Sequence, residues 1–137
     1  MNYNEPDKPL FILIEFGKTI SETVKATRLR PEYIQEYGEW GLWLYSCSWR
    51  IEHKELILAS TKSETKEEMV QAVSEFNGRT IEAVDIVYPF WDTVFTFSDD
   101  YVVKTFSTSM ERDHWTLRTP SGKYLVAGPG TSWDYCL

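Results

Sequence analysis

Two short segments of this chain have nearly the same sequence. Residues 13–20 read LIEFGKTI, and residues 73–81 read VSEFNGRTI. Each copy is followed by a polar stretch and then by a pair of strand-like segments. A period this long, present in two copies only, differs from a solenoid, which stacks three or more shorter repeats. We therefore predict one internally duplicated domain over residues 1–137, with pseudo-repeat halves at about 10–60 and 64–128.

The length and composition favour a single folded domain. A chain of 137 residues buries about 68% of its unfolded surface when it folds. Hydrophobic residues make up 42% of the chain, which is unlike a disordered protein. No apolar run approaches the roughly 18 residues of a membrane span. The N-terminus also lacks the basic start and long apolar stretch of a secretory signal, so we expect a cytoplasmic protein with no membrane partner.

The clearest predicted element is a helix over residues 65–77. Thr65 and Glu68 have the spacing of a capping box, in which each side chain bonds to the other's backbone N–H. Gly78 provides the left-handed residue that commonly ends a helix. The apolar residues of this segment fall on one helical face: Met69, Val73 and Phe76.

The match between the two copies predicts a second short helix near the N-terminus. It would span Leu10–Phe16 and end at Gly17, as the other copy ends at Gly78. Residue preference points the other way, because Phe11 and the neighbouring isoleucines favour a strand. Residues 32–39 form either one helical turn or an ordered loop.

The remaining segments predict about eight or nine short strands joined by short turns. Short turns make consecutive strands pair antiparallel. We therefore expect an α+β fold, with a curved, largely antiparallel sheet and helices packed at one side. The last residues, 131–137, read as a short tail. The predicted strands are 19–25, 41–46, 48–53, 56–59, 80–88, 93–97, 101–106, 115–118 and 123–127.

The chain is acidic, with 21 Asp and Glu against 14 Lys and Arg and a net charge of −7. Such a surface repels nucleic-acid phosphates, so we expect no nucleic-acid partner. It attracts a basic protein partner. Net negative charge also serves simply to keep a small protein soluble, and the sequence leaves both interpretations open.

The residue types used in catalysis are few and scattered. His53 lies at a predicted turn and His114 just before a strand, and general acid–base chemistry needs convergence with a substrate pocket. Neither belongs to a metal-ligand spacing. A small enzyme that uses His114 with Glu111 or Asp113 remains an alternative. We nevertheless expect no catalytic activity, no metal and no cofactor.

The two cysteines, Cys47 and Cys136, are far apart and belong to no motif, so a disulfide framework is not expected. Cys47 alternates with aromatic residues on a predicted strand. It is interpreted as a small core residue rather than a reactive thiol.

Six tryptophans form the most unusual part of the composition. Trp91 and Trp133 fall in predicted loops or ends, and each is followed by an aspartate. Exposed tryptophan beside acid is typical of the anchors in protein-binding surfaces. Tryptophans in loops also serve as stacking platforms for sugars.

A resemblance to known proteins rests on five segments: Gly17–Ile20, Trp49–Glu52, Trp91–Asp99, Trp115–Leu117 and Gly128–Trp133. They resemble a group of small single-domain bacterial proteins of unknown function. Some members of such groups look like immunity proteins, which are encoded beside polymorphic or contact-dependent toxins. The shared motifs are turns and strand tryptophans. The resemblance therefore implies a bacterial cytoplasmic protein and carries over no functional residue.

These observations favour a non-enzymatic protein-binding domain, most specifically an immunity protein that neutralises a basic toxin such as a nuclease. The alternative is a small-molecule or sugar-binding module that uses the loop tryptophans. Acidic side chains would steer the partner and an exposed aromatic would anchor it. The candidate contact residues are at hairpin tips, in a loop and in the tail: Asp99, Asp100, Glu111, Asp113 and Trp133.

Overall fold

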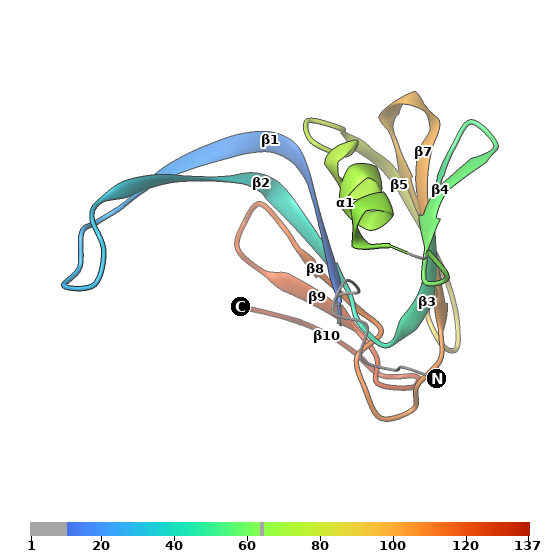
Figure 1. The fold of residues 1–137 in the computed structure, drawn as a ribbon. Coiled ribbons are helices and arrows are strands. Elements are labelled where there is room, and N and C mark those ends of the chain that lie inside the picture. The colour runs from blue at the N-terminus through green and yellow to red at the C-terminus, as the bar shows by residue number, and fades with distance from the viewer. Residues whose placement is uncertain (1–10, 64) are drawn as a thin grey trace.

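The computed structural model describes residues 11–63 and 65–137, and in these ranges it contains ten strands and one α-helix. The strands form two five-stranded antiparallel sheets that face each other across the core (Figure 1). The elements in chain order are β1 (Ile12–Val24), β2 (Tyr33–Leu44), β3 (Cys47–His53), β4 (Leu56–Ser60), α1 (Lys66–Ser74), β5 (Ile81–Val87), β6 (Asp92–Phe97), a 3-10 turn (Ser98–Asp100), β7 (Tyr101–Ser107), β8 (Trp115–Arg118), β9 (Tyr124–Ala127) and β10 (Trp133–Cys136).

The first sheet has the order β1-β2-β8-β9-β10, and the second sheet has the order β4-β3-β7-β6-β5. All pairings within them are antiparallel. The predicted α+β class with mainly antiparallel strands is therefore confirmed, but the strands form two sheets and not the one curved sheet that we expected. Each sheet takes strands from both of the sequence halves, and the internal duplication stays a prediction.

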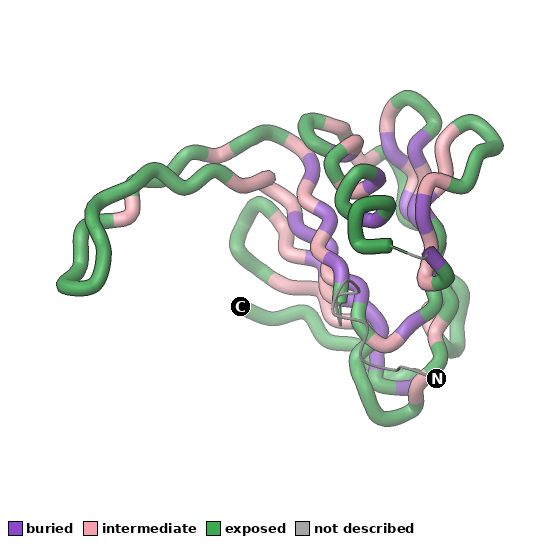
Figure 2. Tube along the Cα trace, in the orientation of Figure 1, coloured by how far each residue is buried: buried purple, intermediate pink, exposed green. Residues whose placement is uncertain are grey.

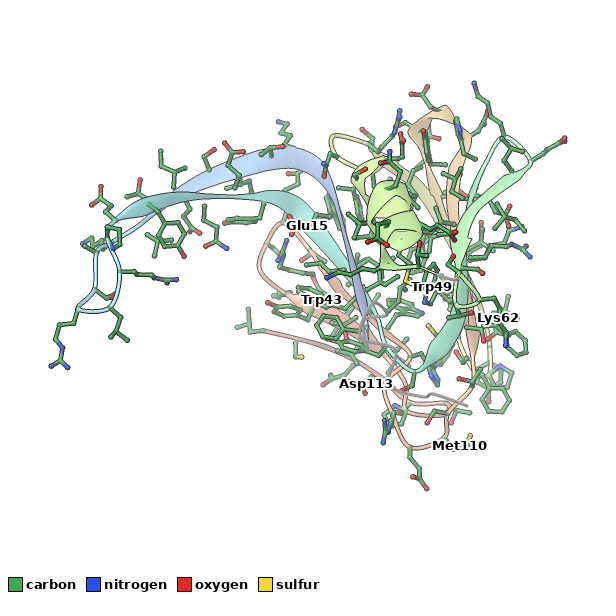
Figure 3. All side chains as sticks on the ribbon, in the orientation of Figure 1. Glu15, Trp43, Trp49, Lys62, Met110 and Asp113 are labelled. Atoms are coloured by element: carbon green, nitrogen blue, oxygen red, sulfur yellow. The ribbon has the colours of Figure 1, made fainter. Side chains whose placement is uncertain are left out.

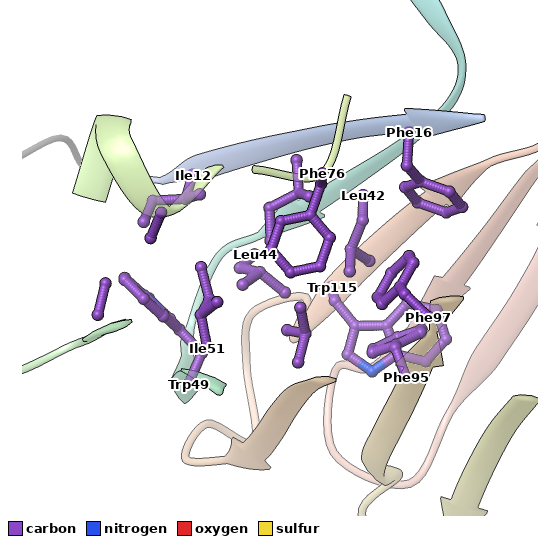
Figure 4. Packing of buried hydrophobic residues seen from close by; sticks show 14 of the residues in the cluster. Ile12, Phe16, Leu42, Leu44, Trp49, Ile51, Phe76, Phe95, Phe97 and Trp115 are labelled. Carbon is purple, nitrogen blue, oxygen red and sulfur yellow. The ribbon is translucent and has the colours of Figure 1, made fainter. Parts of the chain in front are cut away.

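The core lies between the two sheets, where alternate residues of β3, β6, β7, β8 and the inner half of β1 are buried (Figure 2). Phe97 of the second sheet connects three elements in this core (Figure 4). Its ring meets that of Phe16 on β1 edge-on at 4.8 Å and that of Phe76 after α1 at 4.9 Å. Aromatic pairs in this geometry add to the stabilisation from buried area. The helix and both sheets are thus joined at one residue.

Helix α1 lies against β1 and β4, at one open side of the two sheets (Figure 1). Its predicted start is confirmed, because the Thr65 hydroxyl accepts the backbone N–H of Glu68 at 3.3 Å. The helix ends at Ser74, three residues before the predicted end. The chain then tightens, since the Phe76 N–H bonds to the carbonyl of Val73, three residues earlier.

The predicted N-terminal helix is wrong, since residues 12–24 form strand β1 and Leu10 lies outside the described residues. The β-branched residues decide the conformation, as their propensity indicated. Gly17 and Gly78 both have φ of +79°. The first makes a bulge within a strand and the second follows a helix. The shared Glu-Phe pair with a glycine after it, directly at Gly17 and beyond Asn77 at Gly78, therefore fixes a local backbone angle and not an element. The buried side chains of β1 alternate: Ile12, Ile14 and Phe16.

Two further segments differ from the prediction. Residues 33–39, expected as a helical turn or loop, belong to strand β2, and residues 133–136 of the expected tail form β10. Both are exposed over much of their length, so no alternation of apolar and polar residues marks them in the sequence.

Residues 18–39 form a long hairpin, here called the arm, which projects from the body of the molecule (Figures 1 and 2). It consists of the outer halves of β1 and β2 and the connecting residues 25–32. Strand β8 pairs with β2 only from Gly41 to Leu44, so the arm extends beyond the rest of its sheet.

Candidate functional site

The most distinctive surface feature is an apolar hollow of about 350 Å³, here called the aromatic cleft. It lies where the end of β5 and the start of β6 meet strands β8, β9 and β10. The residues that line it are largely aromatic and aliphatic: Ile86, Tyr88, Trp91, Trp115, Leu125, Val126, Ala127 and Trp133.

Strand register explains why the core opens here. Ala127 on β9 is paired with Trp115 on β8 and with Trp133 on β10, so all three belong to the inner face of the first sheet. The second sheet covers Trp115 and Ala127, which are 1% and 3% exposed, but it does not cover β10. Trp133 is consequently 63% exposed although it occupies an inward position.

Trp91 connects the two sheets at this cleft. Its indole Nε1 donates a hydrogen bond to the carbonyl of Ser132 at 2.9 Å, just before β10. Its backbone has φ of +63°, within the turn between β5 and β6. The ring of Tyr88 meets the Trp91 ring edge-on at 5.6 Å. The turn between β5 and β6 therefore exposes aromatic side chains and is hydrogen-bonded to the residue before β10.

Exposed apolar side chains extend from the cleft along β5, the β5–β6 turn and β10. Clusters of this kind on a folded protein mark interaction sites. The large exposed members are Ile86, Val87, Tyr88, Phe90, Trp133 and Tyr135.

The two aspartates that follow the cleft tryptophans in sequence, Asp92 and Asp134, do not line the cleft. The carboxylate of Asp92 accepts the backbone N–H of Ser107, and that of Asp134 accepts the N–H of Tyr135, each at 2.8 Å. Asp92 borders a different hollow together with Val87 and Lys104, and the alternation of side chains along β10 turns Asp134 to the face opposite Trp133.

The structure places the five predicted contact residues at three separate locations. Trp133 lines the aromatic cleft. Glu111 and Asp113 lie in the loop between β7 and β8, and the latter borders a different hollow with Phe11 and Tyr45. Asp99 and Asp100 occupy the turn after β6, at the end of that strand opposite to the cleft. The tryptophans come together, whereas the acids do not.

Asp99 takes part in a local network that joins the helix to the second sheet. Its carboxylate forms an ion pair with the guanidinium of Arg79. That guanidinium lies 4.2 Å from the ring centre of Tyr101. The Tyr101 hydroxyl donates to Glu75 at 3.1 Å, and the ring of His53 stacks on Tyr101 at 3.9 Å. These contacts give Asp99 a structural role.

His114 is fully buried at 0% exposure, and its Nε2 lies 3.0 Å from the carbonyl of Gly130. In this conformation its ring does not meet solvent. Within residues 11–63 and 65–137, no group of three His, Cys, Asp or Glu residues is placed to hold a metal ion. No helix in the same ranges is long and apolar enough to cross a membrane.

Cys47 is part of the core, which confirms its interpretation as a small core residue. Burial raises the pKa of its thiol to about 12. Burial, with a smaller contribution from Asp113, also raises the pKa of the Tyr45 hydroxyl.

Sequence reasoning identified Trp91 and Trp133 but missed Ile86 and Tyr88. The available signal was the run Tyr88-Pro89-Phe90-Trp91, which joins two strands. Turns normally carry small polar residues. A turn that consists of apolar aromatic residues therefore indicates a binding surface.

Comparisons of this chain with protein-family models, curated proteins and solved structures found no match.

Proposed function

We propose that this chain is a non-enzymatic protein-binding domain whose contact surface is the aromatic cleft. The observation that carries the proposal is the opening of the core at β10, which leaves Trp133 exposed beside Tyr88 and Trp91. Tryptophan and tyrosine are the residues that most often dominate binding energy at interfaces. A hollow between them accepts an apolar side chain of the partner.

The more specific proposal is an immunity protein that neutralises a basic toxin such as a nuclease. Its support is the net charge of −7. Complementary charge accelerates association and excludes partners of the same sign. The aromatic residues would then hold the complex once it forms.

Calorimetry with a basic toxin domain encoded next to this gene tests the proposal. We expect Trp133→Ala to weaken binding by about 2 kcal/mol or more, as for an interface hot spot. Trp43→Ala is the matched control, because Trp43 is a half-buried tryptophan of β2 that does not line the cleft (Figure 3). Equal losses for both variants, or no loss for Trp133→Ala, would contradict the proposal.

A second candidate function is small-molecule binding in the same cleft. Its volume of about 350 Å³ lies within the range of ligand pockets, about 300–1,000 Å³. The apolar lining suits a flat apolar molecule better than a sugar, which needs many hydrogen-bonding groups. Saturable binding of an apolar dye such as anilinonaphthalene sulfonate, lost in Trp133→Ala and kept in Trp43→Ala, would favour this candidate.

A further inference from the structure

The arm is the part of the fold that the proposed function leaves unused. Every residue from 25 to 32 is exposed, and Leu29 at the tip is 93% exposed. Tyr33 and Ile34 on the returning strand are also exposed. In the described part of the chain, no element packs on the outer half of the hairpin (Figure 3).

The base of the arm is a built joint that fixes its direction. Gly17 forms a bulge, and its N–H donates to the carbonyl of Arg79 at 2.8 Å. The side chain of Glu15, visible at this joint in Figure 3, accepts the N–H of Gly38 at 2.5 Å. Arg118 of β8 donates to the carbonyl of Gly38 at 2.8 Å. A bulge changes the direction of the strand that contains it. The hydrogen bonds around this bulge therefore hold the arm so that it points away from the body of the molecule.

An isolated two-stranded ribbon is only marginally stable in water. Within residues 11–63 and 65–137, β1 is also the first strand of its sheet, so no strand there pairs with its outer backbone edge, and such edges readily pair with another chain. The exposed Leu29 and Ile34 add apolar surface. Contact with a partner would stabilise the isolated ribbon, pair its free backbone edge and bury its exposed apolar side chains.

Charge indicates which partner fits. Residues 25–32 contain three cations, Lys25, Arg28 and Arg30, against one acid, Glu32, so the tip has a net charge of +2. The whole chain has −7, which leaves −9 for everything outside the tip. The tip is therefore complementary to the body of the chain itself.

We propose that the arm binds a second copy of this chain, with each basic tip seated on the acidic body of the other. A two-fold arrangement uses the same contact twice, which is the commonest form of protein dimer. This inference goes beyond the proposed function, because it uses the arm, whose residues do not line the aromatic cleft.

Analytical ultracentrifugation of the full chain, over a concentration series at low and at high salt, tests this dimer. We expect a dimer that weakens with salt, since exposed charges are screened. The double variant Arg28→Glu with Arg30→Glu should weaken dimerisation by about tenfold or more, because two favourable charges become unfavourable. Circular dichroism verifies that the variant is folded.

The matched control is Lys62→Glu with Lys66→Glu, which alters the net charge equally on exposed residues outside the arm. It should leave the dimer intact. A wild-type protein that stays monomeric at low salt would overturn the proposal. So would a dimer that survives the arm variant but is lost in Trp133→Ala, which would assign self-association to the cleft.

Discussion

Cys47 and Cys136 illustrate how one residue type takes two states in this fold. Cys47 is buried, and Cys136 is exposed on the last strand. Only a thiolate reacts readily with a disulfide reagent, and burial suppresses both ionisation and access. We expect one thiol of the folded protein to react quickly with Ellman's reagent and the second to react only after unfolding. Two fast thiols in the wild type, or one in Cys136→Ser, would contradict the buried position of Cys47.

The same burial predicts a dependence of stability on pH. The pKa of Cys47 is raised from 9.0 to about 12 in the folded state. Its contribution is therefore fully present below pH 9 and is lost as the pH rises from about 9 to about 12, by roughly 1.4 kcal/mol per pH unit. Urea unfolding at several alkaline pH values measures the slope. Cys47→Ala should make that slope shallower, and an unchanged slope would refute the assignment.

Single residues of the site were partly predictable from sequence. Trp91 and Trp133 stood out because each is an aromatic outside a clear strand and beside an acid. Ile86 and Tyr88 were not predictable, because their place in the cleft depends on how β5 meets β10, a pairing of distant segments that no local pattern encodes. His114 lies next to acids in sequence, yet it is buried.

Among the elements, those with strong local signals were predicted well. Capping residues marked the start of α1, and Pro, Gly and Asp marked the turns of the β6–β7 and β8–β9 hairpins. The first strand of the arm was predicted at residues 19–25. The returning strand at residues 33–39 was missed because it is exposed over most of its length, so the alternation that identifies a half-buried strand does not arise. The inner part of β1, residues 12–16, was missed because the Glu-Phe pair before a glycine was given more weight than β propensity.

The bulge at the base of the arm gives a test at the level of elements. Gly17 and Gly78 both have φ of +79°, but a Cβ on Gly17 would lie 2.7 Å from the Glu39 side chain, whereas Gly78 has open space around it. Gly78→Ala should cost about 1–2 kcal/mol of unfolding free energy, the usual price of a left-handed alanine.

Gly17→Ala adds crowding to the same strain, so we expect it to cost about 1 kcal/mol or more beyond Gly78→Ala. Urea denaturation of the two variants measures the difference. Equal losses of unfolding free energy in the two variants would mean that the side chains of Glu39 and Trp40 move aside at no cost. The base of the arm would then not hold the arm in a fixed direction.

At the scale of the whole molecule, the two near-identical segments meet in space. The N–H of Gly17 bonds to the carbonyl of Arg79, and the rings of Phe16 and Phe76 both meet the ring of Phe97 edge-on. The similar sequences therefore supply neighbouring parts of one core, although one is a strand and the other a helix end.

We propose two contact surfaces on this molecule, the aromatic cleft and the arm. The aromatic cleft offers an apolar centre for a partner of different sequence, and the arm offers charge complementary to a second copy. The sheet order explains both surfaces, because the first sheet extends past the second at β10 and past its own neighbours at the arm.

The most direct test of the central claim is an NMR titration that follows the indole N–H signals of the six tryptophans as a basic toxin partner is added. The account predicts that the signals of Trp91 and Trp133 shift with the partner concentration while that of Trp43 stays in place. Shifts confined to Trp43, or a bound complex with no shift at Trp91 and Trp133, would contradict the assignment of the aromatic cleft as the contact surface.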